Sequence, residues 1–155
     1  MSDLKASLKQ SRPFNSLYQE AFLNLARTYT VLSDGLDLVL GPQGLSMTQY
    51  NILRMLRGAG PEGLCRNEIG RRLITRMPDV TRLLDRMERD GLISRVRSTE
   101  DRRLVNTILT AHGRQIVDNL DREIAKEHER TLGHLNKTQL TALVELLSLV
   151  RDGAE

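Results

Sequence analysis

Residues 78–97, PDVTRLLDRMERDGLISRVR, carry the clearest structural signals in the 155-residue chain. Pro78 suits the first turn of a helix, and Asp79 suits its positive N-terminal end. Four apolar residues then follow at the spacing of one buried helical face, namely Val80, Leu83, Leu84 and Met87. Gly91 can adopt the left-handed conformation that ends a helix. This stretch therefore predicts a helix over residues 78–90, followed by a strand.

The stretch that follows, residues 97–110, RSTEDRRLVNTILT, has polar residues at its start and alternating apolar residues after them. This pattern predicts a hairpin in which residues 92–97 pair with residues 102–109. Thr110 can then cap a long helix that extends to about His128 or Leu132.

The residues before the helix 78–90 predict a second, shorter helix over 66–74, preceded by a very short strand at 64–65. Ile69 and Leu73 would face inward. Helix, short turn, helix and hairpin in this order predict a winged helix-turn-helix over residues 45–113.

The remaining segments predict helices at both ends of a mainly α-helical, single-domain chain, residues 1–155. The expected elements are a helix over 13–33, a glycine-rich break over 34–47, a helix from Thr48, and a last helix over 138–150. The helical parts 13–40 and 114–152 have apolar stripes that would be unfavourable in water. A homodimer would bury them, and we expect these parts to form its interface.

The charge of the chain is concentrated in its middle. The whole chain carries +3, whereas residues 66–103 contain 11 arginines and 7 acids, which gives +4. All the basic residues of this segment are arginine, whose planar fork suits phosphate and guanine edges. On charge alone a solvated surface explains the segment equally well, but its position in a winged helix favours DNA.

The helix 78–90 predicts a DNA-reading surface. Arg82 and Arg86 are four residues apart and share its outer face, where Arg82 is the candidate for a guanine contact and Arg86 for a phosphate. A solvated face of mixed charge is the alternative for an isolated helix. The predicted DNA contacts are Arg76, Asp79, Thr81, Arg82, Asp85, Arg86, Arg97, Asp101, Arg102 and Arg103.

The hairpin tip contributes three of these residues. Asp101 and Arg103 are two apart on a strand and share a face, so the carboxylate can hold the arginine extended toward a narrow minor groove. Arg102 points the other way, toward phosphate. An ordinary surface ion pair is the alternative interpretation.

These segments resemble the multiple-antibiotic-resistance regulator (MarR) family of winged-helix transcription factors. The matching pieces are LSMTQYNILRML, NEIGRRL, PDVTRLLDRMERDGLISR and DRRLVNTILTAHG. The resemblance implies a homodimer on a pseudo-palindromic operator, with Arg103 in the minor groove and Asp101 as its partner. It also implies a pocket for a small-molecule effector between the dimer helices and the winged unit, and Tyr29 and Tyr50 are candidates to line it. Packing in the dimer interface is equally compatible with these two tyrosines.

The sequence contains none of the motifs expected of an enzyme. It has no Gly-x-Ser-x-Gly, no phosphate loop and no Cys/His pair at suggestive spacing, so we expect no catalytic activity and no cofactor. The three histidines, at positions 112, 128 and 134, are not spaced as metal ligands, so we expect no metal site. No apolar run is long enough to cross a membrane, and residues 1–12 lack the apolar core of a secretory signal. We therefore expect a cytoplasmic protein without a membrane partner.

Cys65 leaves one alternative function open. It is the single cysteine, which excludes an internal disulfide, and it lies beside Arg66 at the predicted start of the helix 66–74, where a thiolate is favoured. The leading hypothesis is a ligand-released repressor that binds specific double-stranded DNA as a homodimer. The alternatives are an oxidant sensor acting through Cys65, a helical dimer that binds protein partners, and a protein that coats DNA without sequence choice.

Overall fold

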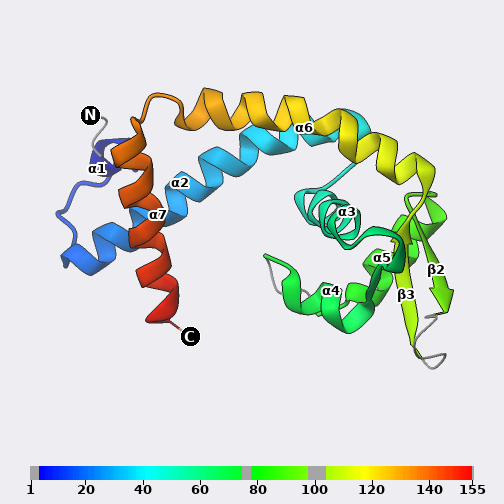
Figure 1. The fold of residues 1–155 in the computed structure, drawn as a ribbon. Coiled ribbons are helices and arrows are strands. Elements are labelled where there is room, and N and C mark those ends of the chain that lie inside the picture. The colour runs from blue at the N-terminus through cyan, green and yellow to red at the C-terminus, as the bar shows by residue number, and fades with distance from the viewer. Residues whose placement is uncertain (1–3, 75–77, 98–103, 155) are drawn as a thin grey trace.

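The computed structural model describes residues 4–74, 78–97 and 104–154. Within these residues the chain forms seven α-helices, two 3-10 helices and one small sheet (Figure 1). The elements are α1 Leu4–Ser7, α2 Leu17–Leu40, η1 Gly41–Gln43, α3 Met47–Ala59, η2 Gly60–Glu62, β1 Leu64–Cys65, α4 Arg66–Arg72, α5 Val80–Arg89, β2 Ile93–Arg97, β3 Val105–Leu109, α6 Ala111–Leu132 and α7 Lys137–Asp152.

The middle of the chain folds as the predicted winged helix-turn-helix. Helices α3, α4 and α5 lie against an antiparallel sheet of strand order β1-β3-β2, and the β2–β3 hairpin forms the wing. In the register of the sheet, Leu64 and Arg95 lie on either side of Thr107, which is buried. The mainly α-helical fold class is confirmed.

One hydrophobic core holds this unit together. Its fully buried side chains come from α2, α3, α4, α5, β2 and α6, namely Leu40, Ile52, Leu53, Leu56, Ile69, Leu84, Met87, Ile93 and Val117. The inward positions expected of Ile69 and Leu73 are confirmed, as are those of Leu84 and Met87, whereas Val80 and Leu83 are only partly buried. Because α6 contributes to this core, it is fixed to the winged unit.

The break predicted over residues 34–47 was placed too early. Helix α2 continues through Gly35 to Leu40, and the chain turns only at η1 and at Gly44, whose φ is +66°. Gly35 is buried against the side chain of Glu127 on α6, and a side-chain Cβ at this position would collide with that carboxylate. The glycine therefore allows two helices to pack closely, and it does not end the helix.

Helix α6 joins the two parts of the molecule. Its N-terminal half packs on the winged unit, and its C-terminal half runs beside α2 (Figure 1). Thr110 caps it as predicted, since its hydroxyl accepts a hydrogen bond from the backbone N–H of Gly113 at 2.9 Å. The residues at both ends of α6 are thus positioned by different neighbours, α3 and the sheet at one end and α2 at the other.

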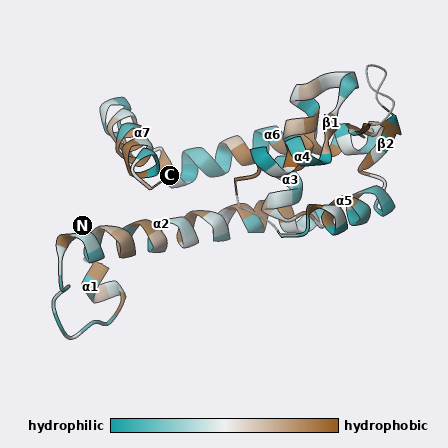
Figure 2. Ribbon diagram, turned by 90° about the horizontal axis from the view of Figure 1, so that it is seen from below, coloured by the Kyte–Doolittle hydropathy of each residue, from teal (hydrophilic) through white to brown (hydrophobic). Residues whose placement is uncertain are grey.

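The part of the molecule away from the sheet exposes apolar side chains. No residue of α7 is buried, and the side chains of Leu146 and Leu149 are 61% and 67% exposed. On α2, Tyr18 and Phe22 are 89% and 69% exposed. Figure 2 shows these hydrophobic segments in brown along α2 and α7.

Smaller differences concern the ends of helices. Helix α3 begins one residue before Thr48 because Ser46 and Gln49 form a reciprocal capping box. Helix α4 ends at Arg72, two residues earlier than expected, and α7 extends to Asp152. Helix α1 was not predicted, since four residues show no periodicity. In the described part of the chain, no helix combines the length and apolar character needed to cross a membrane.

Candidate nucleic-acid interface and ligand cavity

The N-terminal turn of α5 presents Arg82 to solvent. Helix α5 begins at Val80 because the preceding Asp79 caps it, and its carboxylate accepts a hydrogen bond from the Arg82 backbone N–H at 3.0 Å. The same carboxylate pairs with Arg82 Nε at 2.9 Å, while the Arg82 side chain remains 87% exposed. Asp79 therefore holds the Nε side of the guanidinium in place, and the rest of the exposed group is free to contact a partner.

The outer face of α5 continues with Thr81 and Arg86, which are both exposed. The Thr81 hydroxyl accepts a hydrogen bond from Arg66 Nη1 at 3.3 Å, so the start of α4 is linked to the start of α5. Among the described residues Arg86 has no ion-pair partner. Sequence reasoning missed Arg66, because only the fold brings it beside the outer face of α5.

Asp85 is engaged within the protein. Its carboxylate forms an ion pair with Arg95 Nη2 at 2.6 Å, and Glu88 pairs with Arg95 Nη1 at 3.2 Å. Arg95 lies on β2 and was not among the predicted residues. The outward spacing of Asp85 was correct, but its partner in the structure is a strand of the wing.

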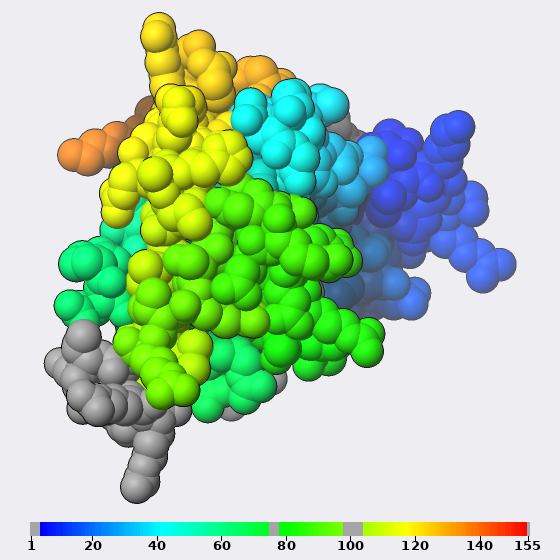
Figure 3. Space-filling view, turned by 90° about the vertical axis from the view of Figure 1, so that its right-hand side faces the viewer, coloured from blue at the N-terminus to red at the C-terminus, as the bar shows by residue number. Residues whose placement is uncertain are grey.

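The remaining predicted DNA contacts lie at the wing and the turn. Arg97 is the last residue of β2, is exposed, and pairs in register with Val105. Arg76, Asp101, Arg102 and Arg103 lie outside the described residues. Figure 3 looks onto this end of the molecule, where green residues of α5 and β2 and yellow-green residues of β3 form one face.

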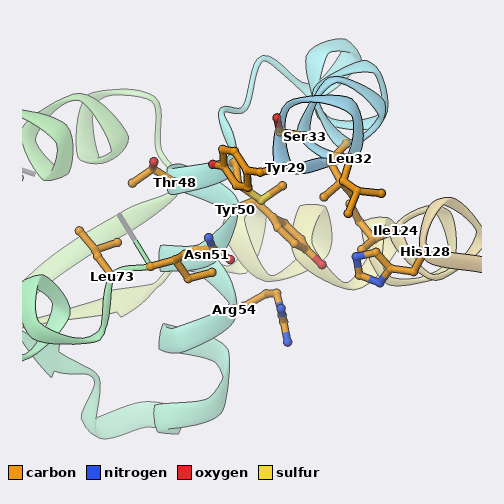
Figure 4. A pocket seen from close by; sticks show the side chains of 13 residues that line it. Tyr29, Leu32, Ser33, Thr48, Tyr50, Asn51, Arg54, Leu73, Ile124 and His128 are labelled. Atoms are coloured by element: carbon orange, nitrogen blue, oxygen red, sulfur yellow. The ribbon is translucent and has the colours of Figure 1, made fainter. Parts of the chain in front are cut away.

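A cavity of about 300 Å³ separates the winged unit from α2 and α6 (Figure 4). Tyr29 and Tyr50, the two predicted pocket residues, both line it. Tyr50 is buried, whereas Tyr29 is 62% exposed. The lining is completed by Leu32, Ser33, Leu36, Met47, Thr48, Asn51, Arg54, Leu73, Ile74, Ile124 and His128.

The polar groups of this cavity gather at one side. Figure 4 shows the hydroxyl end of Tyr50 directed toward His128 and Arg54. The Arg54 guanidinium lies 5.8 Å from the centre of the Tyr50 ring, within the range of a cation–π contact. Burial raises the pKa of Tyr50, so its hydroxyl stays protonated and can donate a hydrogen bond. This side of the cavity therefore combines a cation, a hydroxyl donor and an imidazole.

A three-residue ion-pair cluster ties α3 to α6. Arg57 Nη1 lies 2.8 Å from both Asp118 Oδ1 and Asp121 Oδ2. Hydrogen bonding to Arg57 lowers the pKa of Asp121, and the two aspartates raise the pKa of Arg57. The cluster stays ionised at neutral pH and fixes the first half of α6 on the winged unit.

Cys65 is the N-cap residue of α4 and is half-buried, and its side chain makes no capping hydrogen bond. Within the described ranges, no three His, Cys, Asp or Glu side chains come together as metal ligands would. The redox role of Cys65 stays a prediction.

Comparison with known proteins identifies the fold. The model of the MarR family matches residues 45–105. A MarR transcription factor from Planctomyces limnophilus is 41% identical, with 88% of this chain and 99% of that chain covered and a TM-score of 0.66. The transcriptional regulator PecS of Dickeya dadantii is 29% identical over 97% of this chain and 92% of its own.

The structure of a third similar protein concerns its regulation by a ligand. The structure of Bordetella bronchiseptica BpsR, described as regulated in DNA binding by 6-hydroxynicotinic acid, superimposes with a TM-score of 0.77 at 23% identity. The match covers 91% of this chain and 99% of that one. Members of the family matched here are transcriptional regulators and not enzymes. The chain therefore belongs to the MarR family of transcriptional regulators.

Proposed function

We propose that two copies of the chain form a homodimer that represses transcription from a pseudo-palindromic DNA operator until a small anionic effector releases it. The observation that carries the DNA-binding part is Arg82, which is exposed at the first turn of α5 and steadied by Asp79. The N-terminal residues of a recognition helix are those that meet base edges in the major groove. Arg86 and Arg97, both exposed, add positive charge on the same end of the molecule.

The test is a titration of labelled DNA from upstream of the gene, at two salt concentrations and with scrambled DNA as competitor. The proposal expects tight binding that resists the competitor. Weak binding with a steep salt dependence and no sequence preference would instead favour a DNA-coating protein, and negligible binding would favour a protein partner. Release by peroxide in the wild type, but not in Cys65→Ser, would favour the oxidant sensor.

Arg82→Ala is expected to weaken operator binding by about tenfold per half-site and to relax the preference at one base pair. Arg86→Ala is expected to weaken binding equally on all sequences and to lower the salt slope by about one unit per phosphate contact. The measurement is fluorescence anisotropy on the operator and on variants changed at one base pair.

Arg82→Lys is the matched control, because it keeps the charge and loses the two-pronged fork. If Arg82→Ala loses as much affinity for scrambled DNA as for the operator, Arg82 contacts phosphate and does not read a base.

The effector part of the proposal rests on the cavity. Its polar side holds Arg54, His128 and the Tyr50 hydroxyl, and its remaining lining is largely apolar. Such a site favours a flat apolar molecule that carries one acidic group. BpsR, which has the same fold, responds to an aromatic acid.

Arg54→Ala is expected to weaken binding of 6-hydroxynicotinate or benzoate by about tenfold, because a charge-assisted hydrogen bond is lost. Affinity for the operator without ligand should not change. Isothermal titration of both acids measures this, with neutral benzamide as the uncharged analogue. Arg122→Ala is the control, since this exposed arginine of α6 does not line the cavity. Equal binding of benzoate and benzamide would contradict an anion site.

A further inference from the structure

The contact between α5 and the wing is apolar at one end of the hairpin and polar farther along it. Near the start of β2 it is apolar, because Ile93, Leu84 and Met87 are all buried in the core. Farther along, a hollow of about 260 Å³ separates α5 from the sheet, and its lining includes Thr81, Arg95 and Val105. The outer part of the wing is therefore not held against α5 by apolar packing.

Arg95 bridges this hollow. It follows Ile93 by two residues, so both side chains leave β2 on the face toward α5. Its two terminal nitrogens reach two acids of α5, Asp85 at 2.6 Å and Glu88 at 3.2 Å. The backbone N–H of Arg95 also donates to Glu88 Oε1 at 3.1 Å. Three polar contacts from one residue thus join the strand to one turn of the helix.

These contacts are partly exposed, which limits what they can do for stability. The side chains of Arg95, Asp85 and Glu88 are 31%, 47% and 37% exposed. Ion pairs of this exposure add little to the free energy of folding. A forked arginine between two acids does, however, restrict direction, because both prongs must be satisfied at once.

We infer that Arg95 is a positioning residue that sets the angle between the wing and α5, so that both reach the same DNA site. Arg95 acts through Asp85 and Glu88 and does not itself contact DNA. On this account Asp85 contributes to DNA binding indirectly, by holding the wing. The inference rests on the proposed DNA-binding function.

The contacts of Arg95 with Asp85 and Glu88 are here called the brace. The decisive variant removes the brace without adding negative charge. Arg95→Gln alone leaves two unpaired acids, which would repel phosphate whatever the geometry. The triple variant Asp85→Asn/Glu88→Gln/Arg95→Gln is neutral at all three positions, whereas the wild type carries −1 there. If the trio matters only through its charge, the triple variant binds the operator as well as the wild type or better. If Arg95 is a brace, the triple variant binds about tenfold more weakly.

Two further readouts separate positioning from other roles. The salt slope of operator binding should fall, because a misplaced wing loses phosphate contacts of its own, each of which contributes about 0.9. Hydroxyl-radical protection of the minor groove flanking the site should weaken. Protection of guanine N7 in the major groove from methylation by dimethyl sulfate should persist. The urea midpoint checks that the fold is intact, and Arg95→Lys, which can still meet one acid, should fall between wild type and triple variant.

The outcomes are distinct. Specific binding by the wild type together with full affinity and an unchanged footprint in the triple variant overturns the brace and leaves the proposed function standing. A lowered salt slope with an unchanged footprint in the triple variant also overturns it, in favour of direct phosphate contact by Arg95. Failure of the wild type to prefer the operator defeats the proposed function itself.

Discussion

Replacing both Leu146 and Leu149 with aspartate should convert the protein to a monomer and lower operator affinity by about a thousandfold, toward non-specific binding. Both leucines lie on one face of α7 and are more than half exposed in the isolated chain. Burying such a side chain contributes about 1.5–3 kcal/mol, whereas burying an unpaired carboxylate is strongly unfavourable. A monomer would carry one α5 and would lose the second half-site.

Sedimentation velocity measures the first effect, as a fall in mass to the 17.6 kDa of one chain. Anisotropy on the operator measures the second. The matched control places aspartates at Thr138 and Thr141, which are also exposed on α7. A Leu146→Asp/Leu149→Asp variant that remains dimeric with full affinity would show that the two copies meet through another surface.

Gly113→Ala should lower the free energy of unfolding by about 2–3 kcal/mol, the usual cost of an overpacked core position. Gly113 lies in the first turn of α6 with its Cα against the backbone carbonyl of Leu92, and an added methyl group would collide with that carbonyl. Backbone on both sides must then shift, including the turn that Thr110 caps.

Gly58→Ala provides the opposite result. Gly58 lies within α3, and an added Cβ there meets nothing within 4 Å, so alanine should raise stability by up to about 1 kcal/mol. Urea unfolding of both variants at one protein concentration measures the difference, since a dimer's stability depends on concentration. Equal midpoints for the two variants would mean that α6 can move away from Leu92 at little cost.

The winged unit could be predicted from the sequence because its signals are local. The apolar spacing of α5, the left-handed Gly91 and the Thr110 cap each lie within a few residues of the feature they specify. Each of these signals has one dominant physical interpretation. The predicted order of elements is confirmed by the structure.

Gly35 shows why the break before α3 was misplaced. A glycine followed by other glycines normally marks a turn, and glycine content alone does not distinguish Gly35 from Gly41 or Gly44. The distinction arises from Glu127, which lies far along the chain and packs against Gly35 in the folded protein. Glycine is suited both to the close packing of two helices and to a turn, so the residue type alone does not say which of the two applies.

Some features of the candidate site could be predicted from the sequence and others could not. The exposure of Arg82 and Arg86 follows from helical spacing and could be predicted, and so could the cavity positions of Tyr29 and Tyr50 from the family resemblance. The engagement of Asp85 by Arg95 could not, because it depends on how a strand is placed beside a helix. Arg54 lies one turn after Tyr50 on α3, a spacing that could have drawn it into the predicted cavity.

In the proposed regulation, helix α6 would act as a lever. It has 22 residues and is about 33 Å long, and the cavity contacts it at Ile124 and His128 while the winged unit holds its other end. From Ile124 to the first residue of α6 is about 20 Å, so a tilt of about 10° at the cavity moves that end by about 3.5 Å. One base-pair step in DNA is about 3.4 Å. In the proposed homodimer, a tilt of this size caused by an effector in the cavity would carry each α5 one base-pair step out of register with its half-site.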